Sequence, residues 1–223
     1  MAINQVPNGR PASVAESQRA RVASDGLRSH RHAAFLLEAQ GPRSARDLAD
    51  AVHLLCAVHG RYPGLIALAA QHSAEGSARA WLQEAAAAFE VERNYLLQLT
   101  ASVGPIPSTP GAAQTEASLV AARHAIETLA VSERAGCALG AASALLGDWR
   151  SVRPILDRAA SRAGLDWRAL ELPSEHQIES VLNAVAESPA AARALAFGAE
   201  QMLLQHRALF ALLEARAGAR GDF

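Results

Sequence analysis

The 223-residue chain contains 52 Ala and 28 Leu but only 22 Val, Ile and Thr residues taken together. Because alanine and leucine favour helices and β-branched residues favour strands, this composition predicts an all-α fold with no sheet. The net charge of −1 at pH 7 excludes a global attraction to nucleic acid, and no uncharged apolar run approaches the length of about 18 residues that a membrane-spanning helix needs. We therefore expect neither a nucleic-acid partner nor a membrane partner.

Arginine supplies every basic side chain, because the sequence has 21 Lys and Arg residues and none of them is Lys. Together with the alanine excess, this bias suggests a GC-rich bacterial coding sequence. The two cysteines, Cys56 and Cys137, lie inside helical patterns rather than in a secreted disulfide framework. The first residues lack the apolar core of a signal peptide. We expect a bacterial, cytoplasmic protein with reduced thiols.

The chain is predicted to divide into three parts. Residues 1–28 carry two prolines and two glycines around a short polar stretch and no sustained apolar stripe, so we expect a flexible N-terminal arm with at most one transient helix at 12–23. Residues 29–217 are expected to form one helical-bundle domain. Residues 218–223 are expected to be a short C-terminal tail.

Prolines, glycines and N-cap residues set the predicted helix boundaries within this domain. Predicted N-caps are Ser44, Thr109 before Pro110, Ser174 in a capping box with Gln177, and Ser188 before Pro189. Helices are predicted at 29–40, 44–62 with a continuation to 71, 75–103, 109–146, 174–187 and 188–217. Gly147-Asp148 and Pro154 are predicted to divide the helix 109–146 from a further segment that ends near Gly164. Short connections predict a single bundle of six to eight mostly antiparallel helices.

Small residues are expected to permit one close helix contact. Gly136, Gly140 and Ala144 recur every four residues, which places them on one face of a helix. A neighbouring backbone can approach such a face closely because no large side chain intervenes. We interpret this stretch as a core contact.

Four predicted helices each carry one inward-facing ionisable side chain on an otherwise apolar stripe: His59, Glu92, Glu133 and His206. Carboxylates and imidazoles inside a helical bundle are the ligand types of di-iron and di-manganese centres. These four residues are therefore candidate metal ligands, with iron or manganese as the cofactor. Cysteines one turn from His59 and Glu133 also make a zinc site conceivable. The corresponding function is a metal-dependent oxidoreductase of the ferritin-like or haem-oxygenase-like kind.

The same residues also have a structural interpretation. Four ionisable residues on the stripes are no more than chance predicts, and arginines on neighbouring helices could neutralise the two glutamates. The Glu-x-x-His motif of ferritin-like enzymes, a glycine phosphate loop, Gly-x-Ser-x-Gly and His-Glu-x-x-His do not occur. Our first hypothesis is therefore a non-catalytic protein without a cofactor, which acts through a protein partner or self-association.

Three stretches together resemble a known family. They are His59-Gly-Arg-Tyr-Pro-Gly64, Gly104-Pro-Ile-Pro-Ser-Thr-Pro-Gly111, and Ser132-Glu-Arg-Ala-Gly-Cys-Ala-Leu-Gly-Ala-Ala142 with Asp148-Trp149. The chain is similar here to an uncharacterised bacterial family known only as a domain of unknown function. The resemblance covers roughly residues 47–164. It implies an all-helical fold and carries no activity, cofactor or site residue.

Overall fold

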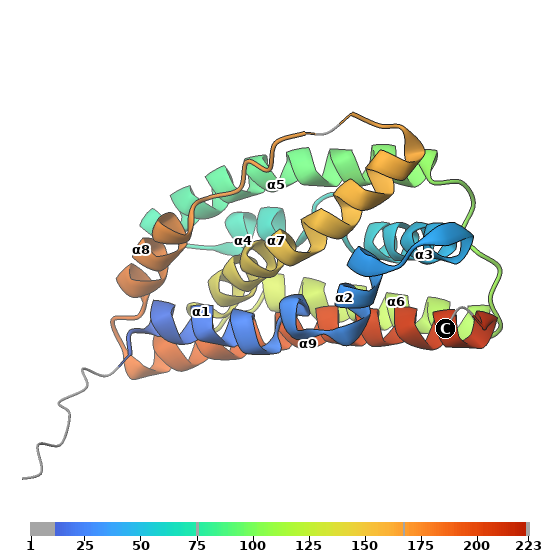
Figure 1. Cartoon of the computed structure of the whole chain (residues 1–223). Helices are drawn as coiled ribbons and strands as arrows, with labels where there is room; N and C mark the ends of the chain where they lie inside the picture. Colours follow the sequence, from blue (N-terminus) through green and yellow to red (C-terminus); the bar gives the residue numbers. More distant parts are fainter. Residues whose placement is uncertain (1–11, 75, 167, 222–223) are drawn as a thin grey trace, which may run out of the picture.

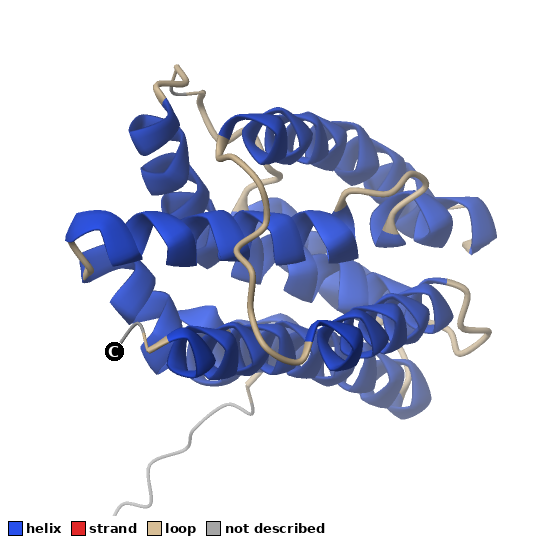
Figure 2. Cartoon of the chain, turned by 90° about the vertical axis from the view of Figure 1, so that its right-hand side faces the viewer, coloured by secondary structure: helices blue, strands red, loops and turns tan. Residues whose placement is uncertain are grey.

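The structure is a computed structural model that describes residues 12–221 except residues 75 and 167. This part of the chain contains nine α-helices, one 3-10 turn and no strand (Figure 2). The elements are α1 (Val14–Asp25), η1 (Leu27–Ser29), α2 (Arg31–Glu38), α3 (Gly41–His59), α4 (Leu65–His72), α5 (Ser77–Ser102), α6 (Ala112–Ala130), α7 (Cys137–Ala163), α8 (Glu175–Val185) and α9 (Pro189–Arg220). The all-α prediction is confirmed, and the described helices number one more than the upper end of the expected range.

Helix α7 lies at the centre of the molecule. It runs obliquely between α5 and α9, and it contacts all the other described α-helices (Figure 1). Its Trp149, Val152 and Ile155 are fully buried. Residues of α7 therefore meet side chains from both ends of the sequence, which is the condition for a buried site built from distant segments.

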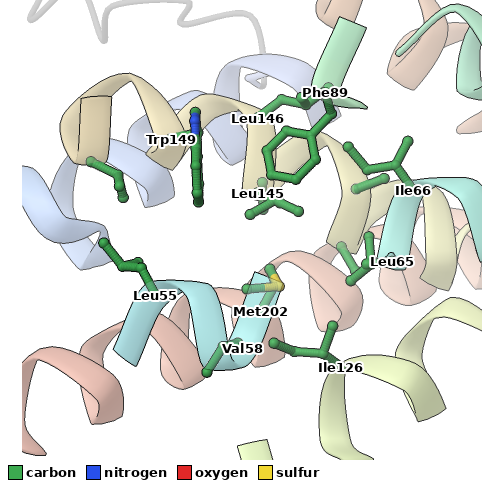
Figure 3. Close-up of a cluster of buried hydrophobic side chains, with 14 of the residues drawn as sticks. Leu55, Val58, Leu65, Ile66, Phe89, Ile126, Leu145, Leu146, Trp149 and Met202 are labelled. Atoms are coloured by element: carbon green, nitrogen blue, oxygen red, sulfur yellow. The ribbon is translucent and has the colours of Figure 1, made fainter. Parts of the chain in front are cut away.

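The hydrophobic core surrounds the middle of α7. Figure 3 shows Trp149 and Leu146 of α7 with Phe89 of α5, and Met202 of α9 beside Val58 of α3. The rings of Phe89 and Trp149 meet edge to face with their centroids 4.9 Å apart. Such aromatic pairs add about 0.5–1.5 kcal/mol beyond the burial of their area.

The small residues of α7 bring it into backbone contact with α9, as the sequence predicts. A Cβ atom added at Gly140 would lie 2.1 Å from the backbone oxygen of Leu195. Gly198 of α9 has the reciprocal role, because its added Cβ would lie 2.0 Å from the backbone oxygen of Cys137. The two helices can keep this separation only if both positions remain glycine.

Gly140→Ala is expected to lower the free energy of unfolding by about 1–3 kcal/mol, because the helices must move apart. The control is Gly147→Ala in the same helix, where the added Cβ meets only Val22 side-chain atoms at 3.4 Å and beyond. That variant should be as stable as the original or up to about 1 kcal/mol more stable, through helix propensity. Urea denaturation of both variants measures the difference, and equal stabilities would contradict the close-contact interpretation.

The N-terminal segment departs from the flexible arm that we expect from the sequence. Helix α1 begins with a capping box between Ser13 and Glu16 and packs against α7, α8 and α9. It is held by ion pairs from Arg19 to Glu179 and from Arg21 to Glu200, and Ala15 is buried. Because α1 packs through small residues and ion pairs, it has no apolar stripe from which its packing could be predicted. Residues 1–11 of the expected arm lie outside the described residues.

Four boundary predictions are wrong. The predicted helix 109–146 is interrupted, because α6 ends at Ala130 and α7 begins at Cys137 after Gly136, whose φ is +96°. The predicted division at Gly147 falls inside α7, which also contains Pro154. The predicted caps Ser44 and Thr109 do not start helices: α3 begins at Gly41 and α6 at Ala112.

Two of the predicted caps are confirmed. Ser174 and Gln177 form the predicted capping box at the start of α8. The Ser188 hydroxyl accepts a hydrogen bond from the Ala191 amide, and Pro189 opens α9. The capping box supplies acceptors for two backbone N–H groups at the start of α8, and the Ser188 hydroxyl supplies one at the start of α9. Both signals lie within a few residues, so these helix starts can be predicted from the local sequence.

Helix α9 continues to Arg220, so residues 218–220 of the predicted tail are helical. Its last turns are anchored to α3 by buried ion pairs. Arg216 contacts both carboxylate oxygens of Asp50, with Nε at 2.9 Å from Oδ2 and Nη2 at 2.8 Å from Oδ1. Arg220 bridges Asp47 and Asp50 at 2.6 Å. Because these carboxylates are buried, the ion pairs fix the C-terminal end of α9 against the core.

Within the described ranges, none of the helices combines the length and the apolarity that crossing a membrane requires.

Candidate functional site

Two of the four predicted site residues meet at the centre of the molecule. His59 is the last residue of α3, and His206 lies in the second half of α9. Their side chains are 6% and 1% exposed, and their Nε2 atoms are 3.0 Å apart in a hydrogen bond. The inward orientation predicted for both histidines is thus observed, and they contact each other directly.

Glu133 lies elsewhere. The prediction that it faces inward from a helix is wrong, because it is exposed in the connection between α6 and α7. The physical reason is the end of α6 at Ala130, which removes Glu133 from the helical spacing on which the prediction depends. The structure therefore separates Glu133 from the buried histidines.

Glu92 faces inward as predicted, but both of its oxygens already have partners. Trp149 Nε1 donates to Oε2 at 3.0 Å, and Arg153 Nη1 donates to Oε1 at 2.7 Å. The Arg153 and Glu92 side chains are 3% and 2% exposed. Glu92 therefore belongs to a buried ion pair between α5 and α7.

The ion pair extends into a second carboxylate. Arg153 Nε donates to Asp157 Oδ1 at 2.8 Å, and the Tyr95 hydroxyl donates to the same oxygen at 3.0 Å. The Arg153 guanidinium also lies over the Tyr95 ring, 4.5 Å from its centroid. Burial, followed by this hydrogen bond to Asp157, raises the pKa of Tyr95 to about 12. The phenol therefore remains a neutral donor at physiological pH.

The four predicted metal ligands do not fit a shared iron or manganese centre. Glu92 has an arginine guanidinium at its carboxylate, which a cation would have to displace, and Glu133 lies at the surface. Over residues 12–221, leaving aside 75 and 167, no group of three or more His, Cys, Asp or Glu side chains is arranged to hold a metal ion. We derive no chemistry through a metal.

Asp148 completes the arrangement of the two histidines, and the sequence analysis missed it. His206 Nδ1 lies 2.6 Å from Asp148 Oδ2, and the Leu27 amide donates to Asp148 Oδ1 at 2.7 Å. Asp148 is completely buried. Helices α3, α7 and α9 thus supply one continuous line of hydrogen bonds, from the Leu27 amide through Asp148 and His206 to His59. We call Asp148, His206 and His59 the relay.

The direction of the hydrogen bonds follows from the Asp148 carboxylate, which can only accept them when ionised. A neutral His206 then carries its proton on Nδ1, and its Nε2 accepts from His59 Nε2–H. The remaining nitrogen of His59, Nδ1, keeps its lone pair and has no hydrogen-bond partner among the described residues. Burial and, secondarily, the nearby His206 hold the pKa of His59 well below 6.5. His59 is therefore a neutral base at physiological pH.

A small chamber lies against His59. It has a volume of about 20 Å³ and is also lined by Phe89, Glu90, Arg93 and Tyr62. This volume is enough for one water molecule, which needs about 10–15 Å³. A surface groove of about 360 Å³ between α4 and α5 shares Tyr62 and Glu90 with the chamber. Ala67 and Ala86 also line both, so the groove and the chamber meet at four residues.

Comparison with protein families places nearly the whole described chain in one family. A family model, described as a family of unknown function (DUF6975), matches residues 22–221. The chain belongs to the DUF6975 family. The match includes all three relay residues and confirms the resemblance to a domain of unknown function, over a longer range than the sequence stretches indicate. No curated protein and no solved structure matches the chain.

In this DUF6975 member, an ion pair lines the chamber. Arg93 binds the Glu90 carboxylate, donates from Nη1 to the Gly60 carbonyl at 3.0 Å, and lies 5.8 Å from the centroid of the Tyr62 ring. The hydrogen bond from Arg93 lowers the pKa of Glu90, so the pair is ionised. Glu90, Arg93 and Tyr62, which we call the gate residues, line the chamber, and Tyr62 and Glu90 also line the groove.

Buried histidines should make the stability of the DUF6975 chain depend on pH. Burial lowers the pKa of His32 from 6.5 to about 4 and that of His59 well below 6.5. As pH falls below 6.5, these histidines bind protons in the unfolded chain but stay neutral in the folded chain. Each such histidine therefore reduces the free energy of unfolding by up to about 1.4 kcal/mol per pH unit until its folded pKa is reached. Above pH 6.5 their contribution is constant.

We expect His32→Leu to reduce the slope of the free energy of unfolding against pH between pH 6 and 4.5, by an amount that corresponds to about one bound proton. Urea denaturation at a series of pH values measures this slope. The matched control is His124→Gln on the exposed face of α6, which should leave the slope unchanged. A His32→Leu slope equal to that of the unmodified protein would show that His32 is protonated in the folded state.

One sequence signal could have identified Asp148. Cys137, Gly140 and Ala144 define the inner face of α7, and Asp148 occupies the next position on the same spacing. The predicted helix end before Gly147 hid this continuation. Its partner, the Leu27 amide, comes from a segment 121 residues away, so no local pattern could indicate the contact.

Proposed function

We propose that this DUF6975 member is a hydrolase in which His59 acts as the general base. The observation that carries the proposal is the hydrogen-bonded relay, which ends at a neutral histidine beside a chamber of about 20 Å³. The groove between α4 and α5 is the substrate-binding surface. The chamber holds the hydrolytic water.

The relay gives the proton a defined route. His59 Nδ1 takes a proton from the water as its oxygen forms a bond to the substrate carbonyl carbon. His59 Nε2–H can then pass to His206 Nε2, which leaves a neutral His59 and an imidazolium at His206. The Asp148 carboxylate, 2.6 Å from His206 Nδ1, stabilises that imidazolium. The proton returns by the same route to the leaving oxygen as the ester bond breaks.

Energetics favours a functional role for the relay over a purely structural one. A buried carboxylate and two imidazoles lose their hydration, and apolar residues of similar volume are often neutral or stabilising in such positions. The relay nevertheless lies among the completely buried side chains of α7 and α9. A titratable group with a strongly shifted pKa beside a pocket, as His59 is, is typical of catalytic sites.

The groove indicates a small and partly apolar substrate. Its walls combine small alanine side chains with the amides of Gln71 and Gln83, and Arg79 lies on its α5 side. A volume of about 360 Å³ lies within the usual range for small-molecule sites, roughly 300–1,000 Å³. We therefore assign short-chain esters as the substrate class, with the carbonyl placed at the gate residues.

The test is hydrolysis of p-nitrophenyl acetate, butyrate and octanoate by the purified full-length chain. His59→Gln is expected to reduce the rate about 100-fold or more, the usual contribution of a general base. His124→Gln replaces an exposed histidine of α6 and should leave the rate unchanged. Equal rates for the original chain and His59→Gln would refute the assignment of His59.

Two further outcomes would support the functions considered from the sequence. Absence of His59-dependent turnover with all three esters would favour a non-catalytic protein that acts through protein contacts. Turnover that survives in His59→Gln but disappears after chelation would favour the metal-dependent alternative. Measurement of iron and manganese in the same preparation would then identify the ion.

A further inference from the structure

Residues of α1, α7 and α8 line a second groove. Figure 1 shows α1 and α8 at one end of the molecule, where both contact α7. Its volume is about 440 Å³. Ala15 and Val22 of α1 form its apolar floor together with Ile178 and Leu182 of α8. None of the relay or gate residues lines it, so it is separate from the proposed hydrolase site. Its size and apolar floor suit a small amphipathic molecule.

Gln18 lines this groove, and its amide oxygen is buried without a hydrogen-bond partner among the described residues. Gln18 is 6% exposed, and its Nε2 donates to the Ser143 hydroxyl at 2.6 Å. The Ser143 hydroxyl in turn donates to the Leu139 carbonyl at 2.7 Å, which fixes the orientation of the amide. Gln18 Oε1 is buried and has no hydrogen bond in the described structure. A ligand hydroxyl would satisfy this acceptor.

Two arginines supply positive charge further along the groove. Arg150 Nη2 donates to the Pro173 carbonyl at 2.6 Å, but its Nε is buried without a partner. Arg28 is exposed, and no described carboxylate pairs with it. Arg19 is neutralised by Glu179, while Glu175 lies in the first turn of α8, where the helix dipole stabilises a carboxylate. The side nearest Arg28 and Arg150 therefore favours an anionic group.

The spacing of the polar groups sets the length of the ligand. Ser143, which holds Gln18, and Arg150 lie two turns apart on α7, a separation of about 10 Å along the helix axis at about 1.5 Å per residue. We propose that this groove binds a linear amphipathic carboxylate with a hydroxyl at its far end, the hydroxyl donating to Gln18 Oε1 and the carboxylate facing Arg28 and Arg150.

The probe is 8-hydroxyoctanoate, titrated into the full-length chain by isothermal calorimetry. Octanoate lacks the terminal hydroxyl and 1-octanol lacks the carboxylate, so both should bind more weakly. Arg28→Gln is expected to weaken 8-hydroxyoctanoate binding about tenfold, as the loss of one charge-assisted contact predicts. Arg43→Gln is the matched control, because Arg43 is an exposed arginine at the start of α3.

Two further variants test the position of the ligand. Ser151→Phe places a large side chain in the groove and should abolish binding. Gln18→Leu should bind octanoate and 8-hydroxyoctanoate with equal affinity, because the acceptor for the hydroxyl is gone. Neither change touches the relay, so ester hydrolysis should continue in both variants and the two proposals can fail independently.

The proposal is overturned if 8-hydroxyoctanoate shows no saturable binding at millimolar concentrations. It is also overturned if binding persists unchanged in Ser151→Phe, which would place the ligand elsewhere. Equal affinity for 1-octanol and 8-hydroxyoctanoate would contradict recognition of the carboxylate. A tenfold loss in Arg28→Gln with no loss in Arg43→Gln supports it.

Discussion

Glu92→Ala is expected to lower the free energy of unfolding by about 3–5 kcal/mol, because it leaves the buried Arg153 guanidinium without its principal counter-charge. The Trp149 indole N–H loses its acceptor in the same substitution. Asp157 still accepts a hydrogen bond from Arg153 Nε, but this is not the nitrogen that contacts Glu92. The same Asp157 oxygen also accepts a hydrogen bond from the Tyr95 hydroxyl. The loss is therefore only partly compensated.

Urea denaturation of Glu92→Ala and Glu133→Ala measures this effect with an internal control. Glu133 is exposed in the α6–α7 connection, so its removal should change the free energy of unfolding by no more than about 0.5 kcal/mol. The double variant Glu92→Leu with Arg153→Met should recover much of the loss, because an apolar pair replaces the ions. A Glu92→Ala protein as stable as the original would contradict the ion pair and favour a metal-ligand role for Glu92.

Asp148→Asn is expected to reduce His59-dependent ester hydrolysis about 100-fold or more while preserving the shape of the side chain. With Oδ1 still accepting from the Leu27 amide, the new amide nitrogen faces His206 and donates to Nδ1. His206 must then carry its proton on Nε2 and donate to His59. The proton of His59 moves to Nδ1, so the nitrogen proposed as the base becomes a donor and can no longer take a proton from water.

The rate with p-nitrophenyl butyrate and the urea midpoint of Asp148→Asn should be measured together. Loss of the charged partner of His206 is expected to lower the free energy of unfolding by about 1–3 kcal/mol, so the folded fraction must be established before rates are compared. Asp166→Asn, at an exposed position after α7, is the control and should change neither quantity. An unaltered hydrolysis rate in folded Asp148→Asn would contradict a role for Asp148 in the relay.

The fold could be predicted from the sequence where the signals are local. Composition predicts helices, and the Ser174 and Ser188 caps each combine a side-chain acceptor with a second helix-start residue. Gly140 predicts the close approach of α7 to α9, which a backbone contact confirms. The helix break was misplaced because Gly147 and Pro154 are strong breakers in isolation, whereas tertiary packing keeps α7 helical through both.

The candidate site could be predicted only in part. His59, His206 and Glu92 are inward-facing, as helical spacing indicates, but spacing cannot tell which groups are in contact. The Glu92 partner, Arg153, comes from α7, whose course was divided in the prediction. Asp148 depends on the Leu27 amide of η1, within a segment that the sequence describes as flexible. Long-range contacts of this kind follow from the packing of α1 and η1 on α7. No sequence pattern indicates that packing.

The protonation state of His59 tests the central claim most directly. Long-range ¹H–¹⁵N NMR spectra of the unmodified protein, recorded between pH 8 and pH 5, distinguish the neutral tautomers from the imidazolium. The relay predicts that His59 remains neutral throughout, with its proton on Nε2 and a bare Nδ1, while His206 carries a proton on Nδ1. A His59 that titrates near 6.5, or carries its proton on Nδ1 at pH 7, would contradict the relay.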